Sequence, residues 1–168
     1  PTPLCNCQNN CTQIGGAGLT TKVNNNGTTL SNFFFGCYNI CGTLDINQDF
    51  NISIATINMG PGARMFVRSG VTLNIALSDI QGCNSMWQGI ILENGAHISL
   101  IQASISDAQY AIDCQGNVTF DKCIGITFAN NYVGIHSPPG GFKNINTPIF
   151  SGNSFLFNTW KPFFQGQS

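Results

Sequence analysis

Trp87-Gln88-Gly89-Ile90 is followed by two similar stretches, Gln109-Tyr110-Ala111-Ile112 and Tyr132-Val133-Gly134-Ile135, in which an aromatic residue precedes a small residue and then isoleucine. The small residue moves from position 89 to 111 and then to 134, spacings of 22 and 23 residues. A second series places an apolar residue two positions before Asp79, Asp107, Asn130 and Asn158. A repeat of about 20 residues is typical of stacked supersecondary units, so it indicates the fold class ahead of any other feature.

The composition points to an extracellular β-rich protein. Charged residues make up 8% of the 168 residues, compared with about 25% in ordinary soluble domains. Hydrophobic residues still make up 42%, and Asn, Gly, Thr and Ser take the place of the missing charges. The net charge of −1 gives no electrostatic basis for binding nucleic acid or an anionic membrane surface. No apolar run approaches the roughly 20 residues that span a bilayer, so we expect no membrane insertion.

The cysteine count is even, which suits an oxidising compartment. A zinc site is the alternative, but C-x2-C pairs are absent and the two histidines are remote in sequence. The pattern therefore favours disulfides, although the sequence leaves the connectivity open. The disulfide candidates are Cys5, Cys7, Cys11, Cys37, Cys41, Cys83, Cys114 and Cys123.

Short apolar runs separated by Gly, Asn, Asp or Ser recur from Gly42 onward, and no stretch reads as an amphipathic helix of three turns. A β-sandwich would show hairpin turns and no fixed repeat, whereas a parallel β-helix shows one coil per repeat. The sequence therefore predicts an all-β, right-handed parallel β-helix (β-solenoid) of about five or six coils. We place it at residues 42–159, after a Cys/Asn-rich capping or docking segment at 1–41 and before a tail at 160–168.

Stacked coils put equivalent residues into columns. Ile90, Ile112 and Ile135 are predicted to form one inward column, because they share a place in the repeat. Small side chains at each repeat predict a tight corner at Gly89, Ala111 and Gly134. Asp and Asn bind backbone groups at bends and tolerate left-handed conformations, which predicts a turn ladder of Asp79, Asp107, Asn130 and Asn158.

An ordered series of motifs within residues 42–135 resembles the β-helix region of secreted, right-handed parallel β-helix surface proteins of Bacteroidota, which are associated with type IX secretion. The resemblance implies a fold and an export route to the cell surface, and it implies no activity. Such proteins often carry a C-terminal sorting domain; none is recognisable here, nor is a signal peptide, so we expect a processed chain or a segment. The motifs are Met59-Gly60-Pro61-Gly62-Ala63, Val67-x-Ser69-Gly70-Val71-Thr72-Leu73, Ile80-x-Gly82-Cys83, Met86-Trp87-x-Gly89-Ile90, Asn94-Gly95-Ala96 and Ser104-Ile105-Ser106-Asp107-Ala108-x-Tyr110-Ala111-Ile112.

A carbohydrate-active module is the alternative function, because many right-handed β-helices bind or cleave acidic polysaccharides. A hydrolase needs paired carboxylates, and a pectate-lyase-like enzyme needs an acidic calcium site and a base. Asp113 and Asp121 could face a groove with Lys122, but that constellation is weak. His97 and His136 lack a third metal ligand nearby. We therefore expect no enzyme activity, and we assign no catalytic residue, metal or cofactor.

A solenoid has two open ends, and each end exposes a strand edge over the core. Both termini of this chain are rich in aromatic residues, which predicts head-to-tail self-association into a fibre. We therefore expect an extracellular structural or adhesive protein, a self-assembling subunit of a cell-surface filament, with a surface polysaccharide as a further possible partner. The candidate interface residues are Phe33, Phe34, Phe35, Phe155, Phe157, Trp160, Phe163 and Phe164.

Overall fold

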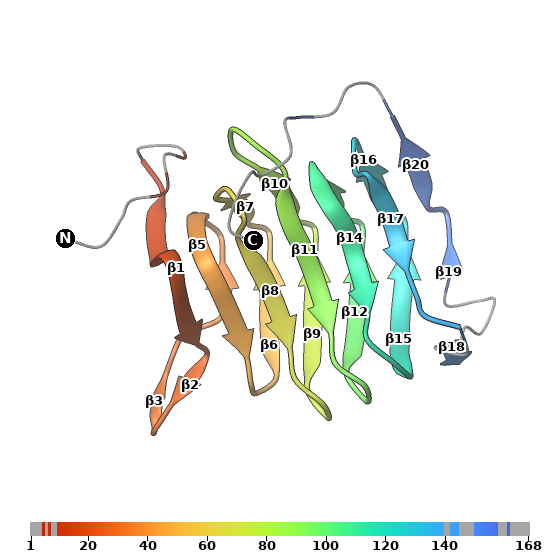
Figure 1. Ribbon diagram of the computed structural model, residues 1–168, viewed down its shortest axis with the longest axis horizontal. Helices are drawn as coiled ribbons and strands as arrows, with labels where there is room; N and C mark the ends of the chain where they lie inside the picture. The colour runs from red at the N-terminus through yellow and green to blue at the C-terminus, as the bar shows by residue number, and fades with distance from the viewer. Residues whose placement is uncertain are drawn as a thin grey trace.

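The computed structural model describes Cys5, Cys7 and residues 10–139, 142–144, 150–157 and 161. Across these residues the secondary structure consists of strands and turns, and the strands lie side by side along one long axis (Figure 1). Successive windings pair in parallel, and the exception is a hairpin of β2 (Asn24–Asn25) and β3 (Thr28–Thr29). The chain is therefore a parallel β-solenoid of about six windings, as the repeat predicted.

Each winding contributes a strand to each of three faces, which we number in chain order within the winding. Face one contains the first half of β5 (Cys37–Ile46), β7 (Thr56–Met59), β10 (Asp79–Gly82), β13 (Ser104–Ser106), β16 (Thr127–Ala129) and β20 (Ser154–Leu156). Face two contains the second half of β5, β8 (Arg64–Val67), β11 (Trp87–Leu92), β14 (Ala108–Cys114) and β17 (Val133–His136). Face three contains β4 (Phe33–Phe34), β6 (Phe50–Ser53), β9 (Thr72–Ala76), β12 (His97–Ile101), β15 (Val118–Ile124), β18 (Phe142–Asn144) and β19 (Phe150–Ser151).

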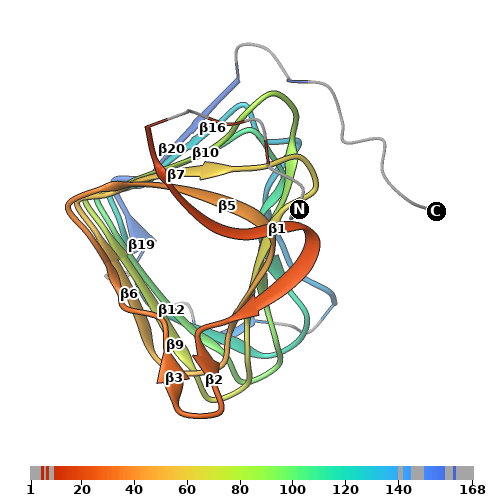
Figure 2. The same cartoon turned by 90° about the vertical axis from the view of Figure 1, so that its left-hand side faces the viewer.

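Figure 2 views the solenoid from its N-terminal end. The chain passes from β6 to β7 and on to β9 in a clockwise sense while it moves away from the viewer, so the winding is right-handed. This hand is the one expected for crossovers between parallel strands.

The predicted inward column is confirmed. Ile90 pairs with Ile112, and Ile112 pairs with Ile135, on three consecutive windings of face two. Ile90 and Ile112 are fully buried, and Ile135 packs against the core. A second column on face one runs through Ile57, Ile80, Ile105 and Phe128. Vertical stacking of apolar side chains therefore forms one continuous core along the axis.

The structure places two residues of the predicted turn ladder at one corner and a third at a different corner. Asp107 and Asn130 follow paired strand residues on adjacent windings, and both have left-handed backbones with φ of 61° and 55°. Asp79 instead begins β10 and pairs with Thr56 and Ser104, so it lies at a different corner. Asn158 lies outside the described residues, and the residue level with Asn130 is Phe157.

The predicted corner at Gly89, Ala111 and Gly134 is also misplaced, because all three residues lie within strands. Gly89 lies level with Tyr110, and the register between β11 and β14 shifts directly after it. Its φ is 123°, and a Cβ atom there would come within 1.6 Å of the Tyr110 carbonyl oxygen. The small residue therefore serves a β-bulge in which the backbones approach closely.

The predicted boundary at residue 41 falls inside β5, so the solenoid begins earlier. β1 (Thr12–Lys22) pairs in parallel with β5 along faces one and two, and β4 pairs with β6 on face three. A register shift between Gly15 and Thr20 divides β1 into two regular segments. The predicted capping segment is thus part of the first windings, and β1 is its outermost strand.

Three disulfides fasten the N-terminal segment to face one: Cys5–Cys41, Cys7–Cys83 and Cys11–Cys37. Cys114 and Cys123, which were also disulfide candidates, are free thiols buried in the core. Their side chains continue inward columns below Leu92 and Leu100, where a small apolar group fits.

Replacing Gly89 with Ala tests the bulge. The added Cβ must displace the Tyr110 carbonyl, and the backbone must keep a φ that side chains rarely adopt, so we expect the stability to fall by about 3 kcal/mol. Urea unfolding followed by circular dichroism measures this. Gly70→Ala is the control, because its φ is 73° but nothing lies within 4 Å of the new atom. We expect a loss of about 1 kcal/mol there, and equal losses in the two variants would contradict the bulge.

Candidate functional site

Amide side chains stack on the outer side of face one beneath the N-terminal segment. Asn58 donates from Nδ2 to Oδ1 of Asn39 at 3.1 Å, and Gln81 donates from Nε2 to Oδ1 of Asn58 at 3.0 Å. The Asn58 amide also contacts the sulfur of Cys37 at 3.3 Å. Asn39 and Asn58 are buried because the disulfide-bonded segment covers them. Such amide ladders satisfy buried polar groups from one winding to the next.

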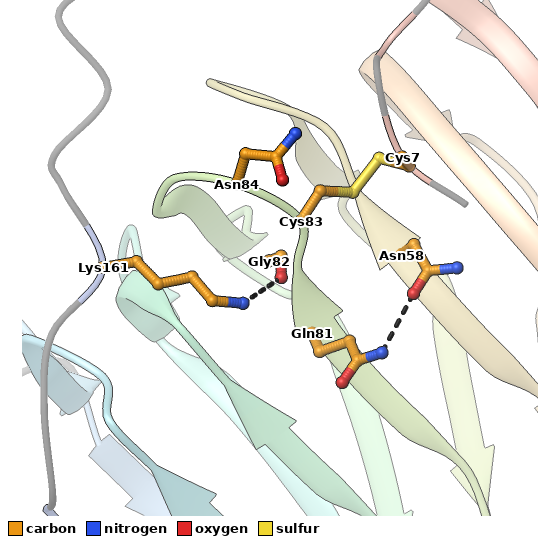
Figure 3. Close-up of a pocket in the computed structure, with 7 residues that line it drawn as sticks. All are labelled: Cys7, Asn58, Gln81, Gly82, Cys83, Asn84 and Lys161. Carbon is orange, nitrogen blue, oxygen red and sulfur yellow. Dashed lines mark hydrogen bonds between the residues drawn. A yellow bond between two sulfur atoms is a disulfide. The ribbon is translucent and has the colours of Figure 1, made fainter. Parts of the chain in front are cut away.

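A cavity of about 360 Å³ adjoins this ladder, between the Cys7–Cys83 disulfide and the tail residue Lys161 (Figure 3). Lys161 donates from Nζ to the Gly82 carbonyl, and it forms an ion pair with Oδ2 of Asp107 at 2.9 Å. The Asp107 side chain is largely buried. The ammonium and the Asn58 amide are already engaged with protein groups, so a ligand entering the cavity would have to compete with these contacts.

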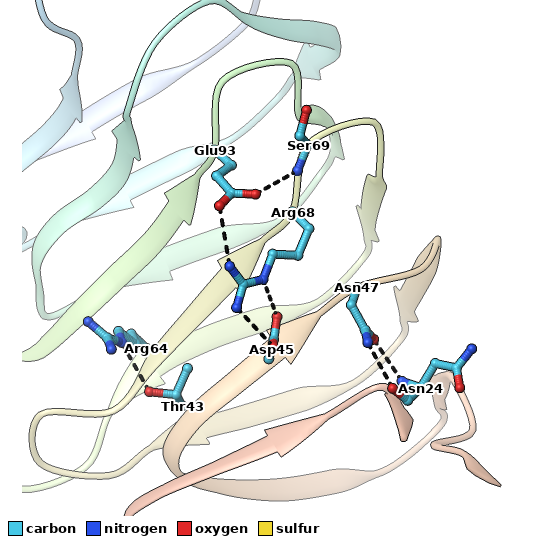
Figure 4. Close-up of polar contacts among 8 residues, drawn as sticks. All are labelled: Asn24, Thr43, Asp45, Asn47, Arg64, Arg68, Ser69 and Glu93. Atoms are coloured by element: carbon cyan, nitrogen blue, oxygen red, sulfur yellow. Dashed lines mark hydrogen bonds and ion pairs between the residues drawn. The ribbon is translucent and has the colours of Figure 1, made fainter. Parts of the chain in front are cut away.

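A charged cluster crosses three windings of face two (Figure 4). The guanidinium of Arg68 contacts the buried carboxylate of Asp45 through two nitrogens, at 2.7 and 3.1 Å, and reaches Glu93 at 3.3 Å. The hydrogen bond to Asp45 is the main cause of the raised pKa of Arg68. The guanidinium also lies 4.5 Å from the centre of the Phe66 ring. This cluster neutralises a buried carboxylate and ties neighbouring windings together.

The acidic and basic residues considered for a carbohydrate-active module lie on different faces of the solenoid. Asp113 lies on β14 of face two, whereas Asp121 and Lys122 lie on β15 of face three. Each aspartate instead lies beside a histidine of a neighbouring winding, within contact distance of its ring. Nδ1 of His136 lies 2.7 Å from Asp113, and Nδ1 of His97 lies 3.4 Å from Asp121. Within the described ranges, no three His, Cys, Asp or Glu side chains gather as a metal site.

The predicted interface residues fall into three groups. Phe33 is buried, stacks on Tyr38 at 4.3 Å and is therefore a core residue, which corrects that assignment. Phe34, Phe35, Phe155 and Phe157 are exposed. Trp160, Phe163 and Phe164 lie outside the described residues, as does most of the predicted tail at 160–168.

Sequence reasoning missed the amide ladder and the Asp45–Arg68–Glu93 cluster, although the repeat contained their signal. Gln81 follows Asn58 by 23 residues, and Arg68 follows Asp45 by 23. One full winding separates the members of each pair. Polar residues at the repeat distance therefore predict contacts between neighbouring windings, just as the isoleucines at that distance do. The pairing of Lys161 with Asp107, across 54 residues, leaves no such signal.

No protein-family model, curated protein or solved structure matches this chain. The fold itself defines the class, an all-β parallel solenoid closed by disulfides. Disulfides indicate an oxidising environment such as the extracellular space. In the part of the chain described, no helix is suited to crossing a membrane. The predicted Bacteroidota origin and type IX secretion stay predictions.

Replacing Arg68 with Met tests the charged cluster. The change keeps an apolar stem over Phe66 but leaves the buried carboxylate of Asp45 without its cation. We expect a loss of about 2 kcal/mol in the free energy of unfolding, below the usual cost for a fully buried pair because Arg68 is partly exposed. Glu93→Gln, which changes an exposed partner, should cost no more than about 0.5 kcal/mol. Equal losses would contradict the central role of Asp45.

The two free thiols give a second test. Burial raises the pKa of both Cys114 and Cys123 from 9.0 to about 12, so the folded protein keeps them protonated at pH 8. Because the thiolate is the nucleophile, we expect no alkylation by iodoacetamide in native buffer. In urea without a reductant, mass spectrometry should show two alkylated cysteines. Rapid native labelling, or more than two adducts in urea, would contradict the thiol and disulfide assignments.

Proposed function

We propose that the chain is a non-enzymatic, extracellular structural subunit that associates head to tail into a cell-surface filament. The observation that carries this proposal is the exposed apolar surface at the C-terminal end of the described solenoid. Phe155, Leu156 and Phe157 are 61, 57 and 64% exposed in the last described winding. Phe155 stacks on Phe128 at 4.9 Å, so it extends an inward column that a further winding would cover.

The strand edges at the two ends suit each other. β20 is the outermost strand of face one at the C-terminal end, and residues Thr12–Gly15 of β1 occupy the same face at the N-terminal end. All strands of the face run in one direction, so β20 of one copy can add beside β1 of the next in the parallel sense. Addition of this kind is heterologous and repeats without closing, which generates a filament.

Variants that block one end each test this arrangement. Leu156→Ser with Phe157→Ser removes the exposed apolar groups of the C-terminal end, and Thr12→Lys with Gln13→Lys places charges on the edge strand β1. We expect the unmodified chain to form concentration-dependent species longer than a dimer in analytical ultracentrifugation, and we expect each blocked variant to lose these longer species. Leu77→Ser is the control and should keep the species longer than a dimer, because it removes an equally exposed leucine away from both ends of the solenoid.

Mixing the two blocked variants distinguishes head-to-tail contact from other arrangements. Each variant retains one functional end, so an equimolar mixture should form a heterodimer that joins one copy of each variant, and it should form no filament. A mixture that remains monomeric while the unmodified chain assembles would contradict head-to-tail contact. An unmodified chain that remains monomeric at all concentrations would overturn the proposal of end-to-end assembly.

A further inference from the structure

The corner between face three and face one carries a column of left-handed residues. Six residues occupy this column on successive windings, and their φ values run from 47° to 65°. In the first five members the backbone N–H donates to the carbonyl of the residue before the next member, as in Ile54 to Ala76 at 3.1 Å and Leu77 to Ile101 at 3.0 Å. The members, in order of winding, are Phe35, Ile54, Leu77, Gln102, Gly125 and Gly152.

The first three members combine backbone strain with exposure. Phe35, Ile54 and Leu77 are 78, 46 and 54% exposed, so they project apolar groups into solvent; we call them the apolar ridge. A left-handed backbone is unfavourable for residues with a Cβ and most unfavourable for a β-branched one such as Ile54. Gly125 and Gly152 make the same corner without that strain. The corner requires the left-handed backbone, but it does not require large apolar side chains there, and strained outliers of this kind point to function.

The same corner is recessed from the last ridge residue, Leu77, onward. A surface cavity of about 410 Å³ lies along the third to fifth windings, where its lining includes Leu77, Gln102, Ser104, Gly125 and Thr127. Side-chain size thus falls along the corner from phenylalanine to glycine. One half projects, and the other half is recessed.

We propose that two copies of this chain pack side by side and antiparallel along this corner. An antiparallel two-fold arrangement sets the first winding of one copy against the sixth of the other. Phe35 then faces Gly152 of the second copy, Ile54 faces Gly125, and Leu77 faces Gln102. The ridge of each copy fills the recess of the other. A parallel arrangement would oppose Phe35 to Phe35 and leave the glycines facing each other.

Charge fits the same arrangement, and the small contact area fixes how strong it can be. Asp79 is the charged residue in the lining of the hollow. The two-fold axis places it opposite the hydroxyl of Ser104, its neighbour in the column, and not opposite a second Asp79. Six windings make a corner about 24 Å long, and a contact confined to this single corner buries less than the roughly 800 Å² per partner of a standard interface. The pair is therefore a reversible dimer that forms at high protein concentration, and it does not depend on the end-to-end contact.

Sedimentation equilibrium of the Leu156→Ser, Phe157→Ser chain tests the pairing, because its C-terminal end is blocked. We expect a monomer–dimer equilibrium in this chain. Ile54→Gly should weaken dimerisation by about tenfold or more, since it removes a central ridge residue. The same change relieves the strained backbone, so the thermal midpoint should stay constant or rise. Leu77→Asn should also weaken dimerisation without lowering the thermal midpoint, because asparagine tolerates the left-handed conformation.

Cysteine cross-linking tests the antiparallel orientation in the same background. An equimolar mixture of Ile54→Cys and Gly125→Cys chains should form a disulfide-linked heterodimer under mild oxidation. Ile54→Cys alone should not, because the two cysteines would lie three windings apart, about 14 Å. Cross-linking of Ile54→Cys with itself would overturn the antiparallel arrangement. The proposal would be overturned if the end-blocked chain stayed monomeric at millimolar concentration. It would also be overturned if Ile54→Gly left dimerisation unchanged and lowered the thermal midpoint.

Discussion

The vertical register between windings is the constraint on which the rest of the structure depends. Parallel backbone pairing places each residue above and below its counterparts one winding away. Apolar residues therefore meet apolar residues in the core, and amides meet amides on the outside, as Asn51 and Asn74 do at 3.0 Å on face three. With a charged content of only 8%, such lateral pairing takes the place of the salt bridges of ordinary surfaces.

The sequence predicted the winding but not the position of every residue within it. Isoleucines at the repeat distance identified the inward column, because a core position repeats once per winding. The turn-ladder prediction failed at Asp79 because an apolar residue two places before Asp occurs at more than one corner. Leu77, before Asp79, is exposed with a left-handed backbone, whereas Ile105, before Asp107, is buried. A bulge after Gly89 shifts the register by one residue, and a spacing of 22 or 23 cannot reveal it.

The N-terminal segment shows the limit of sequence reasoning most clearly. Eight cysteines predicted disulfides, yet the pairs join residues 26 to 76 positions apart, and two thiols are core residues. Each pairing depends on where the segment crosses face one, a tertiary feature that no local pattern encodes. The surface features that bear on function, namely the aromatic end and the apolar ridge, likewise emerge only when exposure is known. Both follow from windings that stack in register, so the functional proposals depend on that stacking.

Methyl-labelled NMR spectroscopy tests the stacking most directly. In a sample with labelled isoleucine methyl groups, nuclear Overhauser effects should connect Ile112 with both Ile90 and Ile135, which are its partners on the windings before and after it. The same methyl pattern should link Ile80 with Ile57 and Ile105 on face one. Absence of these contacts, or close Hα–Hα contacts of the antiparallel type between the same strands, would contradict the solenoid.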